Sequence, residues 1–144
     1  MVGHMSVDPK TVVRTFYSTT DAISAGTLAP SALEEVAAPG FVVHMPDGTT
    51  IDRDGFKAVQ HSFGQGFPGS VHTVEDLVAE GDRVAVRIRW RGTHSGEFQS
   101  APPTGATIEL AETGFMRVEG DKVVEFWPLF DSLTLMLGVG LAKM

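Results

Sequence analysis

The 144-residue chain contains no cysteine, one tyrosine and two tryptophans. The absence of cysteine excludes disulfides, thiolate metal sites and cysteine nucleophiles. Basic residues are also scarce, because eleven lysines and arginines stand against eighteen acidic residues and give a net charge of −7. Such a chain has no basic field for nucleic acid or an anionic membrane, so we expect neither as a partner. A neutral small molecule or another protein is the expected partner.

Long hydrophobic runs are missing as well. The longest apolar stretch near a terminus, residues 133–141, is interrupted by polar residues and glycine and is far shorter than the roughly 20 residues of a membrane span. The N-terminus lacks the charged start and hydrophobic middle of a signal peptide, so we expect a cytoplasmic protein. Residues 1–5 read as an expression remnant. Residues 6–144 are predicted to form one domain, since chains usually divide only beyond about 250 residues.

Helix signals occupy the first half of the chain. Asp8 is a suitable N-cap, Pro9 suits the first helical position, and Gly26 ends the periodic apolar pattern. A strand is expected over residues 41–45. The capping and breaking residues predict three helices: one from Pro9 to Gly26, a short one over 32–38, and one that begins after Asp52 and ends at Gly64.

The second half is rich in β-branched residues. Two Glu-Gly-Asp turns, at 80–82 and 119–121, predict two hairpins in one antiparallel sheet. A short helix over 133–137 is expected to follow. Helices first and a curled sheet after them make the fold class α+β. The four predicted strands are 71–80, 83–93, 107–119 and 122–130.

Strand alternation singles out one carboxylate. In the strand from Arg83, the arginines at 87, 89 and 91 share one face, which we expect to point outward. In the strand over 107–119, the even-numbered residues from 108 to 118 share one face, and this face is apolar except for Glu112. A carboxylate in an apolar cavity has its pKa raised by desolvation, which suits acid–base chemistry near neutral pH.

Several ordered motifs resemble the SnoaL-like polyketide cyclase family over nearly the whole chain. The resemblance implies a nuclear-transport-factor-2-like cone, in which a curved antiparallel sheet wraps around N-terminal helices and encloses one deep apolar pocket. It also implies catalysis without a cofactor, and a homodimer. The motifs are Val74–Val84, Gly92–Phe98, Pro102–Gly105, Glu125-Phe126-Trp127 ahead of Asp131, His44 with Pro46, and Gly66-Phe67-Pro68.

The family's catalytic residues are not all present. Its Glu-His-Trp-Asp tetrapeptide stands here as Glu125-Phe126-Trp127-Pro128, so the resemblance places Pro128 where the catalytic aspartate belongs. A second pocket histidine of the family falls at Gly114. Because proline cannot exchange a proton, the family mechanism cannot operate through that position.

We therefore predict Glu112 as the proton-transfer group, with His44 across the cavity as its partner. Two alternatives stay open: a β-bulge would turn Glu112 outward to pair with an arginine, and His44 would then be an ordinary hydrogen-bonded strand histidine. Of the other histidines, His94 is expected in a turn, and His61 and His72 at the surface or the pocket rim.

The sequence thus favours a cyclase or isomerase that acts without a cofactor on a bulky apolar polyketide-like or terpenoid-like molecule. A noncatalytic protein that binds a hydrophobic ligand is the alternative, and an epoxide hydrolase-like enzyme ranks third. The histidines have no paired metal-ligand spacing, so no metal is expected. The predicted pocket residues are Phe16, Tyr17, Phe63, Phe67, Trp90, Gly114, Met116, Phe126 and Pro128.

Overall fold

The structure of the protein is a computed structural model that describes residues 7–144, so the predicted expression remnant at 1–5 lies outside the described residues. Three α-helices and one 3-10 helix accompany six strands in the described part of the chain. In chain order these are α1 (Pro9–Ser24), the 3-10 helix η1 (Pro30–Glu35), β1 (Ala37–His44), β2 (Thr50–Asp52), α2 (Arg53–Gly66), β3 (Val71–Glu80), β4 (Arg83–Thr93), β5 (Thr107–Glu119), β6 (Lys122–Phe130) and α3 (Ser132–Gly138).

The four long strands have the bounds that the turn signals predict, but the region before them differs. The predicted helix over 32–38 is wrong beyond Glu35, because β1 already begins at Ala37. Pro39 and Gly40 lie inside this strand, where its pairing with β6 shifts register between Ala37 and Val42. A proline fits such an irregularity, because it cannot complete a regular ladder. The short strand β2 was not predicted.

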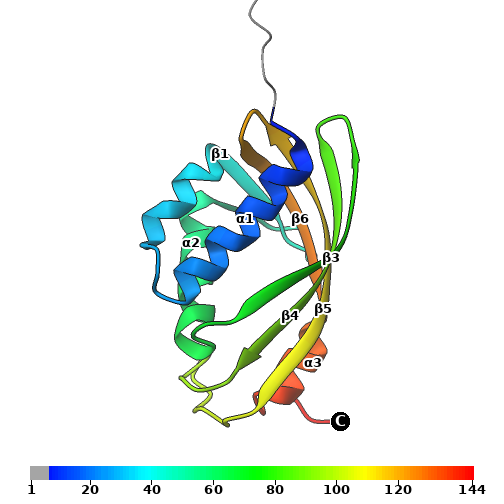
Figure 1. Ribbon diagram of the computed structural model, residues 1–144. Helices are drawn as coiled ribbons and strands as arrows, with labels where there is room; N and C mark the ends of the chain where they lie inside the picture. The colour runs from blue at the N-terminus through cyan, green and yellow to red at the C-terminus, as the bar shows by residue number, and fades with distance from the viewer. Residues whose placement is uncertain (1–6) are drawn as a thin grey trace, which may run out of the picture.

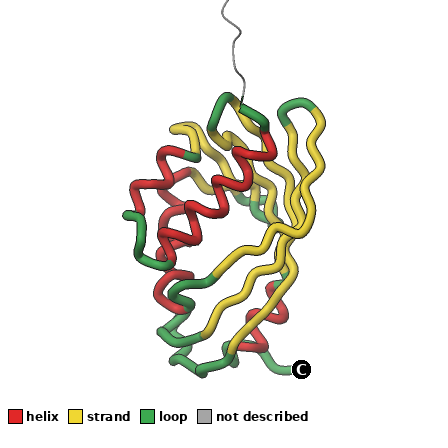
Figure 2. Tube along the Cα trace, viewed as in Figure 1, coloured by secondary structure: helices red, strands yellow, loops and turns green. Residues whose placement is uncertain are grey.

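The strands form one sheet in the order β2-β1-β6-β5-β4-β3. All neighbours are antiparallel except β1 and β6, which run parallel. The sheet curls, and α1 and α2 lie along its concave side, while α3 lies at the end nearest the C-terminus (Figures 1 and 2). This is the predicted α+β cone. No helix within residues 7–144 is long and apolar enough to cross a membrane.

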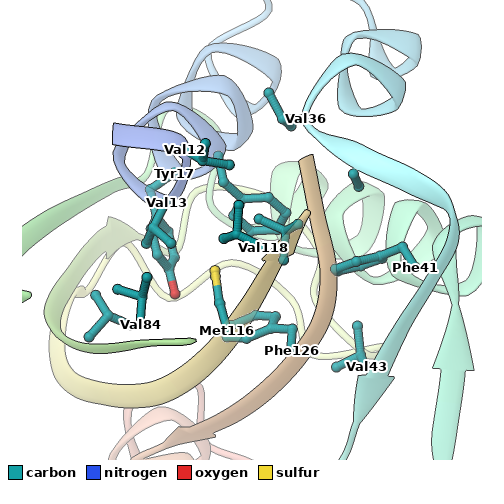
Figure 3. Packing of buried hydrophobic residues seen from close by; sticks show 14 of the residues in the cluster. Val12, Val13, Tyr17, Val36, Phe41, Val43, Val84, Met116, Val118 and Phe126 are labelled. Carbon is teal, nitrogen blue, oxygen red and sulfur yellow. The ribbon is translucent and has the colours of Figure 1, made fainter. Parts of the chain in front are cut away.

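The alternation in β4 and β5 sorts side chains between the two faces as predicted. Every second residue from Val84 to Gly92 is buried, and Arg87, Arg89 and Arg91 between them are exposed on the outer face. The inner face packs against helix faces in two hydrophobic clusters, one toward α1 and β1 and the other toward α3. Figure 3 shows part of the first cluster, with Val12, Val13 and Tyr17 on the α1 side and Met116, Val118 and Phe126 on the sheet side.

Candidate functional site

A cavity of about 110 Å³ opens on the concave side of the sheet. Its lining draws on both hydrophobic clusters, with Phe56 and Phe126 from the first and Trp90 and Leu110 from the second. Apolar and aromatic lining with a few convergent polar groups is typical of a small-molecule site. The other apolar lining residues are Val43, Met45, Ile51, Val59, Phe63, Pro128 and Phe130.

Three ionisable side chains gather at one wall of this cavity: Asp21 from α1, His72 from β3 and Glu112 from β5. His72 Nδ1 lies 2.6 Å from Asp21 Oδ1, and the backbone N–H of His72 donates to Asp21 Oδ2 at 2.9 Å. The same carboxylate therefore holds both the backbone and the ring of His72. No group of His, Asp and Glu side chains in the described chain has the arrangement of a metal site.

The bond to Asp21 determines which nitrogen of His72 faces the cavity. A carboxylate accepts the Nδ1–H, so the neutral ring carries its proton there and leaves Nε2 as the basic atom. Nε2 lies 3.8 Å from Glu112 Oε1, which is too long for a hydrogen bond. His72 Nε2 is therefore a base that is oriented by one partner and close to a second.

Glu112 places a buried carboxyl group beside this nitrogen of His72. Its side chain is 13% exposed, and desolvation by burial raises its pKa above the ordinary value of 4.5, although His72 and the Tyr17 hydroxyl oppose the rise. The Tyr17 hydroxyl donates to Glu112 Oε2 over a long 3.4 Å. Burial raises the pKa of Tyr17 well above 10, so this phenol stays a donor. Glu112 therefore keeps its proton to a higher pH than an exposed glutamate does.

The local structure explains how these residues meet. Tyr17 and Asp21 are one helical turn apart, so they point from the same face of α1. His72 pairs with Trp90 across β3 and β4, and Trp90 belongs to the inner phase of β4. Glu112 is opposite Ile88, which is also inner. The site therefore forms where α1 crosses the inner side of three strands.

Five of the residues predicted for the site line the cavity, namely Glu112, Phe63, Trp90, Phe126 and Pro128. Tyr17 reaches it through the hydroxyl that touches Glu112. The alternative in which Glu112 turns outward to an arginine is wrong, because Arg87 and Arg89 instead face Glu75 on β3. The catalytic role of Glu112 stays a prediction.

Four of the predicted pocket residues, Phe16, Phe67, Gly114 and Met116, are not among the residues that line the cavity. Phe16 and Met116 are fully buried in the first cluster, and Phe67 is fully buried in the second. Gly114 is covered by Phe126, whose ring would stand 3.1 Å from a Cβ at that position. These side chains support the cavity, but they do not line it.

His44 is not in the cavity. Because Val43 points inward, the alternation of β1 turns His44 to the outer face, where its Nε2 bonds Glu125 Oε2 at 2.8 Å. Its ring also stacks on Trp127, with centroids 4.8 Å apart. The prediction that His44 faces Glu112 across the cavity is wrong, and the alternative of a hydrogen-bonded strand histidine is found.

The histidine that does meet Glu112, His72, was predicted at the surface or rim, and Asp21 was not predicted at all. Their meeting depends on the packing of α1 against β3, across 51 positions of sequence. The available signal was the spacing of Tyr17 and Asp21 on one helix face. His94 is fully buried, and its Nδ1 accepts from the backbone N–H of Thr104 at 3.3 Å, so it holds the loop over 94–106 in place.

Residues 11–138 match the profile of the family described as SnoaL-like polyketide cyclase. A comparison with curated protein sequences gives no match. Among solved structures, IdmH of Streptomyces antibioticus, named a candidate polyketide cyclase, is 34% identical with a TM-score of 0.79, and the match covers 93% of this chain and 99% of that one.

Two more distant structures show how widely the fold is used. A candidate SnoaL-like polyketide cyclase of Jannaschia sp. CCS1 has a TM-score of 0.82 at 20% identity, over 99% of each chain. AclR of Streptomyces galilaeus, named a candidate hydroxylase, has a TM-score of 0.78 at 23% identity, over 95% of this chain and 89% of its own. At these identities the likeness concerns the fold alone.

Proposed function

Because the chain belongs to the SnoaL-like polyketide cyclase family, we propose that it is a cyclase or isomerase of a bulky, largely apolar small molecule. The substrate is polyketide-like or terpenoid-like, and the reaction uses proton transfer by side chains without a cofactor. The cavity receives the apolar body of the substrate, excludes water and holds it folded in a reactive geometry.

One observation carries the proposal: a histidine nitrogen and a buried carboxyl group lie side by side in a cavity that is lined mostly by apolar residues. His72 Nε2 and Glu112 Oε1 are 3.8 Å apart, so both can reach neighbouring atoms of one substrate. A histidine nitrogen and a carboxyl group of raised pKa that reach the same substrate are a usual arrangement for general acid–base catalysis. Asp21 acts as a positioning residue, because it touches His72 and fixes its proton on Nδ1.

The proton balance of a ring closure follows from these roles. His72 Nε2 takes a proton from a carbon next to a carbonyl, and the electron pair left on that carbon attacks a second carbonyl of the same substrate. Protonated Glu112 gives its proton to the oxygen that becomes a hydroxyl. The imidazolium then returns a proton to the Glu112 carboxylate, and the pair is reset.

With His72 and Glu112 as base and acid, the reaction needs no ionisable side chain at Pro128. The side chain lines the cavity, but it has no proton to exchange, and its ring leaves that part of the wall apolar. Glu112 lies nearby, since Gly114, two residues further along β5, is paired with Pro128. We propose that acid–base chemistry in this chain has moved from the β6 position to the wall formed by α1, β3 and β5.

A noncatalytic ligand-binding protein is the second candidate, and the mostly apolar lining favours it. Epoxide hydrolysis is less well supported, because Arg87, Arg89 and Arg91 point away from the cavity, and no arginine lines it. The binding alternative predicts tight retention of an apolar ligand with no change to it. Catalysis predicts that His72 and Glu112 are needed for a chemical step.

We further propose a homodimer that forms through the outer face of the sheet. Phe115 and Leu129 are 57% and 58% exposed there, and Trp127 is paired with Phe115 across β5 and β6. Apolar side chains on three neighbouring positions of a sheet favour burial against a partner.

The experiment uses a small enolisable ketone, 1-tetralone, in D₂O. Mass spectrometry follows the replacement of the hydrogens next to the carbonyl by deuterium. The wild type should accelerate this exchange over buffer, and a His72→Asn, Glu112→Gln double variant should not. Equal rates for the two proteins, with 1-tetralone bound equally by both, would favour the noncatalytic binding protein.

A further inference from the structure

A second cavity of about 220 Å³ lies among α1, η1 and α2, next to the one described above. Its floor is apolar, with Ile23, Pro30 and Leu33. Its polar residues are Ser24 of α1 and, from α2, Lys57, Gln60, His61 and Gln65. The mechanism proposed above uses none of these residues.

The two cavities share part of their walls. Ser24, Gln60 and Gly64 line both of them, and Gln60 and Gly64 are one turn apart on α2. Gly64 has no side chain and that of Ser24 is small, while the side chain of Gln60 is unbranched and flexible. Only a thin partition therefore separates the second, outer cavity from the first one. We call the side of the first cavity with Asp21, His72 and Glu112 the catalytic wall.

Gly64 leaves an opening in that partition. A Cβ at this position would meet no atom within 4 Å, apart from its own helix. The contrast with Gly66, two residues later, is clear, since a Cβ there would stand 2.7 Å from Phe98 Cβ. Gly66 is required by close packing, whereas the space beside Gly64 is empty.

The charges around the outer cavity limit what it would accept. Lys57 Nζ is 2.7 Å from Glu34 Oε2, and Asp54 lies 3.9 Å from it, so carboxylates already compensate this ammonium. The amides of Gln60 and Gln65 remain as donors to an oxygen acceptor. An uncharged group with hydroxyl, ester or amide oxygens fits these surroundings better than a carboxylate does.

We infer that the two cavities form one bipartite ligand site, connected beside Gly64. The substrate is then an elongated molecule with two unlike parts. Its apolar body lies at His72 and Glu112, and a chain passes between Ser24 and Gly64 to a neutral, oxygen-bearing end in the outer cavity. The inference rests on the proposed ligand role of the first cavity, and it adds the length and polarity of the substrate.

A series of fluorescent ligands tests this assignment. The probes are 2-naphthol and 2-naphthyl ethers that carry a terminal hydroxyl on chains of two to eight carbons. Titration of the wild type should show affinity rising about threefold to fourfold for each methylene that enters the passage and the outer cavity. An ether whose hydroxyl is replaced by a carboxylate should bind less tightly than its hydroxyl counterpart of equal length.

Two variants change the passage in opposite directions. Gly64→Leu fills the empty space and should remove the gain from chain length, measured relative to the binding of 2-naphthol to the same variant. Gln60→Ala widens the passage between the cavities and should keep or increase the gain in affinity with chain length. Gly64→Ala is the matched control, because one methyl group leaves room for the chain. Melting curves of all variants check that they remain folded.

The outcomes separate this inference from the proposed function. Binding of 2-naphthol with no dependence on chain length overturns the bipartite site and leaves the catalytic wall untouched. The same length dependence in Gly64→Leu as in the wild type also overturns it. If the ether that ends in a carboxylate binds more tightly than the hydroxyl ether of equal length, the inference that the outer cavity takes a neutral group is overturned. Failure of every probe to bind overturns the inference together with the ligand role of the first cavity, whereas loss of exchange activity alone bears only on the proposed chemistry.

Discussion

The two faces of the curved sheet each carry a histidine bonded to a carboxylate. On the inner face, His72 Nδ1 is 2.6 Å from Asp21; on the outer face, His44 Nε2 is 2.8 Å from Glu125. The surroundings differ far more than the distances. The side chain of His72 is 13% exposed at the wall of an apolar cavity, whereas that of His44 is 34% exposed and stacks on Trp127.

The contrast shows that a short histidine–carboxylate bond does not by itself mark a site. The second nitrogen of His72 faces Glu112, a carboxyl whose pKa burial raises. Glu125 has its pKa lowered instead, first by the hydrogen bond from Arg117 and then by His44. The outer carboxylate is bonded to both Arg117 and His44, whereas His72 and Glu112 line the cavity.

The largest expected effect separates the two histidines. His72→Asn should lower the rate of 1-tetralone exchange by about a hundredfold to ten-thousandfold, the usual contribution of a general base. His44→Asn should leave the rate within about twofold, because the outer pair has no contact with the cavity. Exchange rates from mass spectrometry, measured at saturating ketone, check both values. Similar losses in the two variants would remove the distinction between the faces.

The same contrast should appear in stability. Val84 is fully buried on the inner face, while Val78, on the neighbouring strand, is 62% exposed. Val84→Ala should lower the free energy of unfolding by about 1.5–3 kcal/mol, the value of burying a valine side chain. Val78→Ala should lower it by less than about 1 kcal/mol. Urea denaturation of both variants provides the measurement, and equal losses would mean that the outer strand surface is also buried.

The two glutamates should give opposite dependences on pH. The folded pKa of Glu112 lies above 4.5, so the stability contributed by its proton is lost as pH rises from 4.5 through the folded pKa. Glu112→Gln removes this loss. The free energy of unfolding of the variant, relative to wild type, should therefore rise with pH above 4.5.

Glu125 has a folded pKa below 4.5, so its ionised form stabilises the wild type above that pH, and the contribution is lost as pH falls. Relative to wild type, Glu125→Gln should become less stable as pH rises toward 4.5 and should change little above it. Urea denaturation across the pH range tests both variants. Curves of the same sign would contradict the difference in surroundings.

The smallest effect on activity is expected from the outer apolar residues. Phe115→Asp should shift the protein from dimer to monomer in gel filtration, because a charge would face the partner. Exchange activity per chain should stay within about twofold, since Phe115 points away from the cavity. Thr107→Asp, on the same strand face but at the other end of β5, serves as a control for added charge. A Phe115→Asp protein that elutes like the wild type would argue against the proposed dimer face.

Much of the fold could be predicted from the sequence, because alternation and turn chemistry are local. The Glu-Gly-Asp turns and the arginines of β4 were enough to predict four strands and to place Glu112 on the inner face. The beginning of β1 was mistaken, since Pro39 and Gly40 are ordinary helix terminators and the irregular pairing that accommodates them depends on β6.

The site was harder to predict. Strand β3 contains a register shift between Val74 and Asp76, so inner positions change from His72 and Val74 to Leu77 and Ala79. No single alternating pattern describes that strand, and His72 was predicted at the surface or the pocket rim. Asp21 reaches it only because α1 packs on the sheet, and nothing local in the sequence reports that contact.

The pH dependence of 1-tetralone exchange tests the central claim most directly. If Glu112 is the acid, the wild-type rate should fall at high pH as Glu112 ionises, because burial raises its pKa. Glu112→Gln, whose amide cannot ionise, should lose the alkaline fall. A wild-type rate that keeps rising with pH, or an unchanged alkaline fall in Glu112→Gln, would contradict the account.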